Sequence, residues 1–422
     1  MINSINDGLK IESEIPFFKI SSFEFEWKPN CHAILQISGY IDINDVCEIE
    51  MLYGSKIKII QLIQSEWKPI FWGYITYVIQ KKVGSVMLMS LKILSTTCML
   101  DLKSGQKTFQ KTEKTYADII EEVVKNSGGQ VICTEGNSEN IGKPLIQYQE
   151  STWVFCKRVC SYMGGCIIAD ITNERPSLWF GMRKGEYIQG VKEITYNICI
   201  KCLSQEDQEP TYEVESRCFY RIGDIISFNG DNLIVCSVRA SFEHGELIYG
   251  YVLKKTVNCE RMLYNELYAG IGFRGTITDV QGESVKIALD IDKDADEGEY
   301  LYEWYPETGN GMYAMPEIGV KAILFIPCHD ERRGFVVHCL QGETQRGEPC
   351  NKYCTDSRGQ TFHIFMDHVN LYKGTKHSLS IEDKYIKTDC IENISIVSKD
   401  RIRIVASKIF IESLDKVDIC QG

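Results

Sequence analysis

A short repeat at the C-terminal end of the sequence constrains the fold more than any other feature. Between residues 378 and 422, units of the form apolar–x–apolar recur with steps of 7, 8, 8, 7 and 8 residues. Within each unit the period is two, which is typical of a strand with one apolar face. Glu, Asp, Lys and Ser lie between the units and suit turns. The apolar positions are Leu379, Ile381, Ile386, Ile394, Ile396, Ile402, Ile404, Ile409, Ile411, Val417 and Ile419.

A fixed repeat of this kind indicates stacked rungs, each of which buries its apolar row only against other rungs. Six short rungs in one chain cannot close much of a core, whereas several chains wound together can. The repeat therefore predicts an intertwined, triple-stranded β-helical needle, most simply trimeric, whose interior holds the apolar positions given above. A plain antiparallel meander with regular hairpins is the alternative. The near-constant step, without Gly or Pro between the rungs, favours the needle.

Composition and charge exclude several other classes of protein. The chain has 422 residues, is 44% hydrophobic and 25% charged, and has a net charge of 46 − 58 = −12. This balance argues against a nucleic-acid partner held by bulk electrostatics. No apolar run approaches the ~20 residues of a membrane span. The N-terminus has neither a basic start nor an apolar core, so we expect no secretory signal.

The cysteines predict neither a disulfide framework nor a metal centre. There are 18 of them, many in apolar strand patterns, and without a secretory signal they read as reduced cytosolic thiols. One CxxC occurs, at Cys199–Cys202, with no second pair at zinc-ribbon spacing. In a strand its two sulfurs would point to opposite faces.

A search for catalytic and ligand-binding motifs finds none. The sequence has no Gly-rich phosphate loop, no HExxH and no GxSxG. His363 and His368 near Asp367 fall on opposite strand faces, and the acidic run 290–296 lacks the Gly and Glu of a calcium loop. Residues 303–306 read as a packed loop, with a sugar-stacking loop as the alternative. We therefore predict no catalytic, cofactor or metal site, and no enzyme.

The rest of the chain is mainly β, with one α/β insert. Short alternating strands predict antiparallel β-barrels on either side of two helices, the first begun by a capping box at Thr115–Asp118 and the second starting at Ser151. Residues 53–88 echo residues 222–249, either as a true duplication or as a pattern common to many hairpins. The predicted parts are a first barrel at 1–107, the insert at 108–189, a second barrel at 190–257, a linking helix at 258–271, an OB-type barrel at 272–345, a linker and needle entry at 346–377, and the needle at 378–422.

This order of parts, together with three passages, resembles VgrG-type spike proteins, which correspond to the fused hub and spike of a contractile phage tail. Gln147–Phe155 is similar to the family's QYxESdwxF helix start, and Gly311–Ala322 to the strand signature of its OB barrel. Asp356–Gln360 is similar to the entry into its β-helix. The resemblance covers essentially the whole chain in order.

The resemblance implies a structural trimer in which each chain gives two hub barrels, so that six barrels face a hexameric inner tube. Such a spike punctures a target envelope in a type VI secretion-like system, a tailocin or a phage tail. The implied partners are the tube, baseplate proteins, a PAAR-type cap at Val417 and Ile419, and effectors carried with it. The implied location is cytoplasmic during assembly and outside the cell after contraction, with membrane contact only during puncture.

Two departures from the family pattern refine this expectation. Some members carry an enzyme between the OB barrel and the needle or at the end, but this sequence has about ten linker residues at the first place and stops at Gly422. No histidine follows His377, so we expect no metal tip and a separate cap protein.

Two other function classes stay open at this stage. A receptor-binding trimeric tail fibre or adhesin also uses β-helices, but we expect such a protein to end in a globular head. A cell-wall hydrolase with an OB binding module needs a carboxylate pair in a cleft. The α/β insert shows no such pattern.

Overall fold

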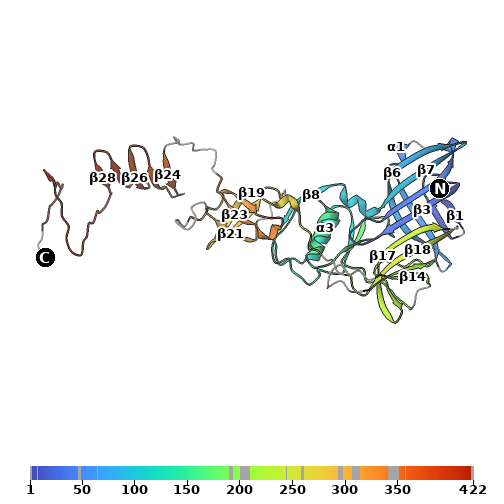
Figure 1. Ribbon diagram of the computed structural model, residues 1–422. Helices are drawn as coiled ribbons and strands as arrows, with labels where there is room; N and C mark the ends of the chain where they lie inside the picture. Colours follow the sequence, from blue (N-terminus) through green and yellow to red (C-terminus); the bar gives the residue numbers. More distant parts are fainter. Residues whose placement is uncertain are drawn as a thin grey trace. The chain divides into compact units, whose positions relative to one another are not determined.

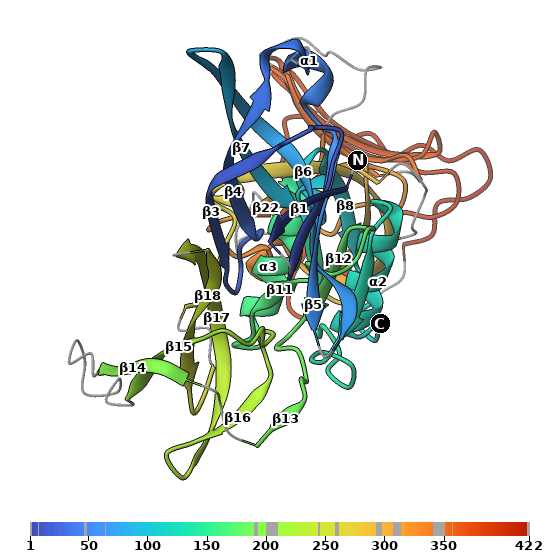
Figure 2. The same ribbon diagram turned by 90° about the vertical axis from the view of Figure 1, so that its right-hand side faces the viewer.

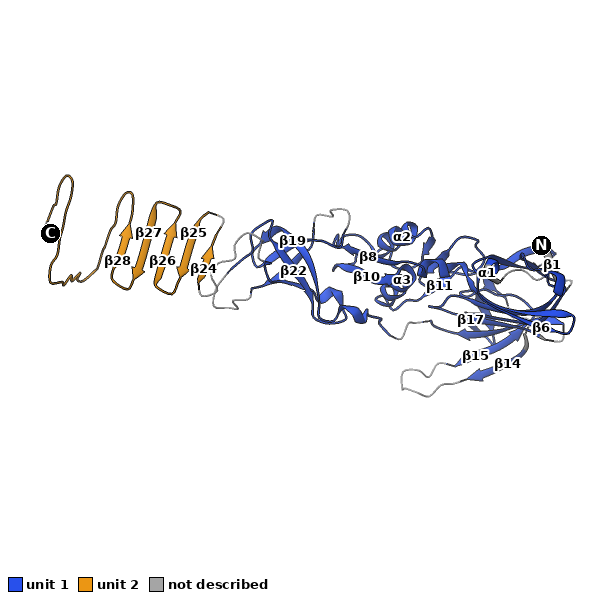
Figure 3. Cartoon of the chain, turned by 90° about the horizontal axis from the view of Figure 1, so that it is seen from above, with its two compact units in different colours: residues 1–340 blue, residues 341–422 orange. Residues whose placement is uncertain are grey.

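The computed structural model divides the chain into two compact units, residues 1–340 and 341–422 (Figures 1 and 3). Each unit is considered by itself. The described residues are 2–6, 8–45, 49–63, 65–189, 193–199, 210–243, 245–257, 261–292, 298–306, 314–340, 351–356 and 358–419. No helix among them is long and apolar enough to cross a membrane.

The first unit contains two sets of strands that flank the α/β insert. The first set is β1 (Ile2–Asn6), β2 (Leu9–Glu12), β3 (Lys19–Trp27), β4 (Ile34–Asp42), β5 (Lys56–Ile63), β6 (Glu66–Val83) and β7 (Val86–Ser95), with η1 (Ile43–Asp45) and α1 (Ile49–Leu52) between β4 and β5. The second set is β13 (Tyr187–Ile188), β14 (Glu193–Cys199), β15 (Thr211–Ser216), β16 (Ile225–Phe228), β17 (Asp231–Glu243) and β18 (Glu246–Lys254).

Both sets belong to one 13-stranded sheet, because β3 pairs with β17 (Figure 2). This differs from the two separate barrels predicted at 1–107 and 190–257. The strand order β5-β6-β7-β4-β3 in the first set recurs as β16-β17-β18-β15-β14 in the second. The repeated order supports a true duplication rather than a pattern common to many hairpins.

The pairing registers show which residues of the two strand sets are equivalent. The β6–β7 ladder has a bulge at Thr76, and the β17–β18 ladder has one at Cys236, 160 positions later. The β3–β4 ladder has a bulge at Ser21, and the β14–β15 ladder has one at the matching position 194. Because a bulge is a specific local feature of a strand, its recurrence fixes which residues of the two sets are equivalent.

The insert packs two helices with a small sheet. Its elements are η2 (Thr96–Asp101), β8 (Ser104–Phe109), α2 (Tyr116–Asn126), β9 (Gln130–Cys133), β10 (Leu145–Ser151), α3 (Thr152–Ser161), β11 (Ile167–Ala169) and β12 (Ser177–Phe180). Strands β11, β12 and β9 form one sheet, and β10 pairs with β8. The predicted capping box at Thr115 and Asp118 is confirmed, and Ser151 caps α3 by accepting from the Val154 amide.

A five-stranded barrel follows, made of β19 (Ile271–Gln281), β20 (Ser284–Leu289), β21 (Leu301–Tyr305), β22 (Lys321–Ile326) and β23 (Phe335–Val337). The closed order β19-β20-β21-β23-β22, with β21 and β23 parallel, is the Greek-key arrangement of an OB-type barrel. The barrel prediction is therefore confirmed in its topology.

Two expectations around this barrel are wrong. Residues 303–305, predicted as part of a loop, are the end of strand β21. The linking helix predicted at 258–271 is absent from its described part, residues 261–271, where only the short turn η3 (Glu266–Tyr268) is helical. Asn265 caps that turn by accepting from the Leu267 amide, and β19 already begins at Ile271.

The second unit is a five-stranded antiparallel meander, β24 (Lys352–Thr355), β25 (Gln360–Ile364), β26 (His368–Lys373), β27 (His377–Glu382) and β28 (Ile386–Asp389) (Figure 3). Four of these strands, β24 to β27, start within the segment 346–377 that was predicted as linker and needle entry. Over residues 352–389 the single chain thus forms the meander that the sequence offered as the alternative. No strand is assigned within residues 390–419.

Candidate functional site

The meander of the second unit is amphipathic, with one apolar face. The registers align Phe362, Leu371 and Leu379 in one row across β25, β26 and β27. A second row on the same face contains Ile364, Val369, Ile381 and Ile386. The exposed fractions of Phe362 and Ile386 are 40% and 72%, respectively. An exposed apolar face of this kind marks an interaction surface.

Leu379, Ile381 and Ile386 of this face were predicted to lie in the interior of the needle, whereas its other members were not predicted. Phe362, Ile364, Val369 and Leu371 precede the regular steps of 7 and 8 residues and were assigned to the linker. The period of two within residues 362–364 and 369–371 is the signal that could have found them.

The other predicted core residues are not brought together in the single chain. They lie between residues 394 and 419, outside any strand, and all are at least half exposed. These are Ile394, Ile396, Ile402, Ile404, Ile409, Ile411, Val417 and Ile419.

The histidines of the meander form aromatic contacts. His363 stacks on Phe365 with ring centroids 4.7 Å apart, and His368 meets the same ring edge-on. His368 also pairs with Asp367 at 2.7 Å. His363, His368 and Asp367, which were considered as metal ligands because they are close in the sequence, thus contact aromatic rings or each other.

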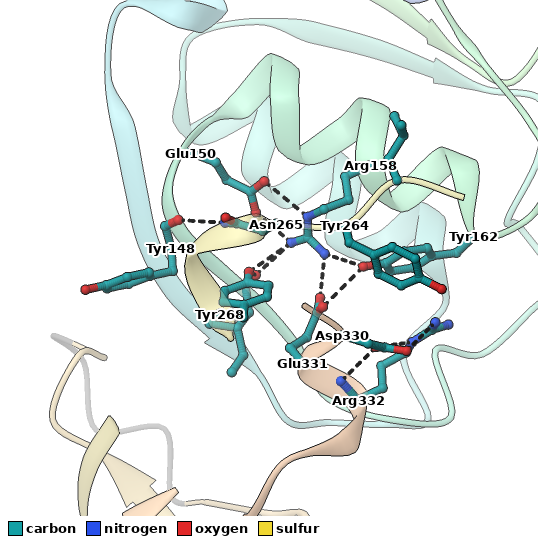
Figure 4. Close-up of polar contacts among 12 residues, drawn as sticks. Tyr148, Glu150, Arg158, Tyr162, Tyr264, Asn265, Tyr268, Asp330, Glu331 and Arg332 are labelled. Carbon is teal, nitrogen blue, oxygen red and sulfur yellow. Dashed lines mark hydrogen bonds and ion pairs between the residues drawn. The ribbon is translucent and has the colours of Figure 1, made fainter. Parts of the chain in front are cut away.

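In the first unit the strongest polar cluster surrounds Arg158 on α3 (Figure 4). Its guanidinium donates to both carboxylate oxygens of Glu150, at 3.1 and 2.6 Å, and to Glu331 at 2.6 Å. It also donates to the hydroxyls of Tyr162 and Tyr268. Arg158, Glu150 and Glu331 are all buried. This cluster joins α3 and the end of β10 to two turns at the barrel, η3 and η5 (Glu331–Arg333).

The electrostatics of the cluster follow from one cation between two buried carboxylates. Burial alone lowers the pKa of Arg158, but the charges of Glu331 and Glu150 and the hydrogen bond to Glu150 raise it well above its ordinary value. Burial raises the pKa of Glu150, and the hydrogen bond and charge of Arg158 oppose that rise. Arg332 lies over the Tyr162 ring at 4.2 Å and adds positive charge nearby.

The cluster explains the passage Gln147–Phe155 that carried the resemblance. Gln149 has a positive φ of 50°, at a bulge in the β10–β8 ladder. The Gln147 side chain bridges this kink by donating to the Glu150 carbonyl at 3.2 Å. Directly after the kink, Glu150 makes its bidentate contact with Arg158, which lies about two turns into the helix that Ser151 caps. The motif therefore builds a joint between structural parts.

Further contacts fasten the insert to the barrel. The Thr108 amide donates to Asp292 at 2.7 Å, and the Gln110 side chain donates to the Ile287 carbonyl at 3.1 Å. Tyr148 packs edge-on against Phe273, with centroids 5.0 Å apart. Polar and apolar contacts together hold the insert against the barrel.

A groove lies over the junction of β3 and β17. Four carboxylates line it, with Arg239 as a partly balancing cation. The carboxylates belong to Glu24, Glu26, Glu213 and Glu215. The groove is thus an acidic feature at the line where the two strand sets meet.

The residues that could have held a metal do not assemble a site in the described part of the chain. There, no group of three or more His, Cys, Asp or Glu side chains has a geometry suited to an ion. Cys202 of the CxxC lies outside the described residues. In the acidic run, Asp290 pairs with Lys321 at 2.5 Å, and Asp292 accepts from Thr108.

Comparisons with known proteins identify the fold. No family model matches the sequence, and no curated protein has significant similarity to it. Among solved structures, the E. coli protein c3393, described as a type VI secretion component similar to the T4 tail proteins gp27 and gp5, aligns with a TM-score of 0.59 at 11% identity, covering 78% of this chain and 98% of that one. The lidless PdpA–VgrG complex aligns at 0.56 and 9% identity, covering 88% and 94%.

The Francisella PdpA–VgrG complex in its half-lidded form aligns with a TM-score of 0.55 at 9% identity, covering 88% of this chain and 84% of that one. These alignments extend over most of the chain at very low identity. They show that the chain has the fold of VgrG-type spike proteins, as the resemblance implied.

Proposed function

We propose that this protein is a structural, non-enzymatic spike subunit of a contractile injection machine, and that it works as a homotrimer. The observation that carries the proposal is the apolar surface of the second unit. Its rows from Phe362 to Ile386 are partly or largely exposed in one chain, and the predicted core positions from Ile394 to Ile419 are at least half exposed. Aliphatic side chains in such number need a partner, and the constant repeat makes identical chains the simplest one.

The energetics favour the trimeric needle. Burial of a large aliphatic side chain stabilises the folded state by about 1.5–3 kcal/mol relative to exposure. Each chain contributes eleven such positions in the repeat. Threefold winding would also give strand partners to residues 390–419, which form no strand in the single chain, and would leave no open edges along the needle.

The likeness in fold to VgrG-type spike proteins supports a set of proposed partners. The strand sets at 1–107 and 190–257 would dock on a hexameric inner tube, with three chains presenting six sets, and contact baseplate proteins. Val417 and Ile419, which are 50% and 89% exposed, would receive a PAAR-type cap and effectors carried with it. We propose assembly in the cytoplasm and release from the cell on contraction, when the needle meets the target envelope.

The test is the mass of the purified full chain in solution, measured by multi-angle light scattering at micromolar concentration. We expect three times the mass of one chain. A monomer at this concentration would contradict the proposed assembly. Negative-stain images would then show whether the trimer tapers to a needle from a broad base.

A further inference from the structure

The internal junction between the two strand sets provides a template for a contact between chains. At this junction β3 adds to the second half of β17, with Glu26 opposite Arg239 and Phe25 opposite Ala240. The first half of β17 pairs instead with β16. One edge of β17 is thus shared by two strands, of which β3 comes from the other set.

The duplication places an equivalent pair of edges elsewhere in the molecule. In the repeated strand order, β14 corresponds to β3, and β6 corresponds to β17. Strand β5 pairs with β6 only as far as Tyr74. From Ile75 to Val83, β6 pairs with β7 and with no other strand among the described residues. Within the described part of the chain, β14 pairs with β15 alone. One chain therefore presents both halves of a second junction without joining them.

The registers assign the residues of that second junction. The spacing of 160 between the β6 and β17 bulges makes Ile79 equivalent to Arg239. The matching bulges of β3 and β14 make Cys199 equivalent to Glu26 and Asn197 equivalent to Glu24. The template then sets Cys199 opposite Ile79, and Asn197 opposite Lys81.

Exposure of the side chains agrees with this assignment. Phe23 and Phe25 of β3 are 3% and 7% exposed, because residues of both sets cover them at the internal junction. Their equivalents on β14, Tyr196 and Ile198, are 47% and 53% exposed. On the other side of the expected contact, Ile79 is also 47% exposed.

One cross-strand pair in each place is chemically matched. The internal junction sets a guanidinium against a carboxylate, Arg239 opposite Glu26. The second junction would set the apolar Ile79 opposite the small, apolar Cys199. Cross-strand pairs of matched character stabilise a sheet, and the different pair chemistry discourages one junction from replacing the other.

We propose that β14 of one copy adds to the second half of β6 in the next copy, with Cys199 opposite Ile79 and Asn197 opposite Lys81. The contact joins two different surfaces, so it propagates from copy to copy and closes into a ring when the rotation allows. Three copies, with two strand sets each, would form a ring of six alternating internal and external junctions. This inference rests on the proposed trimer and adds the surface and register that close it.

Disulfide trapping of the full chain tests the register. Residues directly opposite in an antiparallel pair have Cα atoms about 4.5–5.5 Å apart, within the span of a disulfide. Ile79→Cys supplies one thiol, and the native Cys199 supplies the other. After mild oxidation with copper–phenanthroline, a non-reducing gel should show linked dimers and trimers with the trimer as the largest product. The wild-type chain, oxidised in parallel, gives the background from its other cysteines.

Matched variants isolate the proposed pair. Ile79→Cys combined with Cys199→Ser should return to background, and Lys81→Cys alone should also stay there. Combining Lys81→Cys, Asn197→Cys and Cys199→Ser should restore the linked trimer. Products larger than a trimer would overturn the closed ring, as would linkage that stops at the dimer.

The two proposals fail in different ways. If light scattering shows a trimer but the Ile79→Cys variant gives no disulfide linkage above background, the proposed interface is wrong and the proposed trimer is not contradicted. Linkage by Lys81→Cys with native Cys199, in place of Ile79→Cys, would overturn the register. A monomer in light scattering would contradict the proposed assembly, and the interface with it.

Discussion

At the scale of the residue, Arg158 is the centre of a buried polar cluster in the first unit. It is 2% exposed and satisfies two buried carboxylates, two hydroxyls and the Ile146 carbonyl. Removing one partner of a buried ionic cluster leaves the other charges uncompensated, which is more costly than losing an exposed pair. The contacts reach from α3 to the barrel, so their loss should loosen the junction between these parts.

We expect Arg158→Met to destabilise the chain by about 3–5 kcal/mol, because Glu150 and Glu331 would remain buried without a cation. The measurement is the free energy of unfolding from urea denaturation, compared with wild type. Arg217→Met is the matched control, since Arg217 forms an ion pair with Glu246 in which both side chains are more than half exposed. That change should cost less than about 1 kcal/mol. Equal losses in the two variants would show that the cluster adds little.

The raised pKa of Glu150 makes a second prediction at this scale. Since burial raises this pKa above the ordinary value of 4.5, the folded state binds the proton more tightly than the unfolded state. The stability that Glu150 contributes is then complete below pH 4.5 and is lost as the pH rises through its folded-state pKa. Lowering the pH towards 4.5 should therefore shift the Tm difference between wild type and Glu150→Gln in favour of wild type.

Glu174→Gln is the control for this pH series. The hydrogen bond and charge of Lys56 lower the pKa of Glu174, so its contribution is present at neutral pH and fades as the pH falls. The Tm difference should move in the opposite direction. Two parallel trends would contradict the assigned role of burial at Glu150.

At the scale of the element, the sequence predicted those parts whose signals are local. The capping box at Thr115 fixes the start of α2, and the period-two pattern identifies four of the five barrel strands. Strand β21 was missed because Trp304 and Tyr305 adjoin a proline and read as a loop. The linking helix failed because its apolar residues serve other contacts: Tyr268 is buried beside Arg158, and it donates to the Ile146 carbonyl.

The rungs of the proposed needle make the prediction at this scale. We expect Ile402→Asp to prevent assembly of the needle, because threefold symmetry would place three carboxylates near one axis, where burial and repulsion both oppose their charge. Thermal unfolding and the mass of the assembly measure the effect. Lys399→Ala, a change between two rungs, should alter neither. Equal losses of thermal stability in the two variants would contradict the inward position of Ile402.

At the scale of the whole molecule, the duplication could be suspected from sequence but not aligned correctly. The echo between residues 53–88 and 222–249 matched Gly84 with Gly245, yet the hairpin registers make Val86 equivalent to Glu246, one position away. The two glycines occupy different positions of their two-residue loops, which misleads an alignment by residue type. The shared sheet through β3 and β17 joins strands over 200 residues apart, and no local pattern carries that information.

The far end of the chain supplies the last prediction. The proposed tip residues Val417 and Ile419 are exposed, and at the end of the proposed needle their strands would present open edges that favour capture of a partner. Deleting residues 408–422 should abolish binding of a purified PAAR-type protein in a pull-down. The truncated chain should still form a trimer and bind tube protein, because the proposed hub surfaces lie in the first unit. Normal capture of the cap by the truncated trimer would show that the tip is placed wrongly. Loss of both cap and tube binding would point instead to a general failure of assembly.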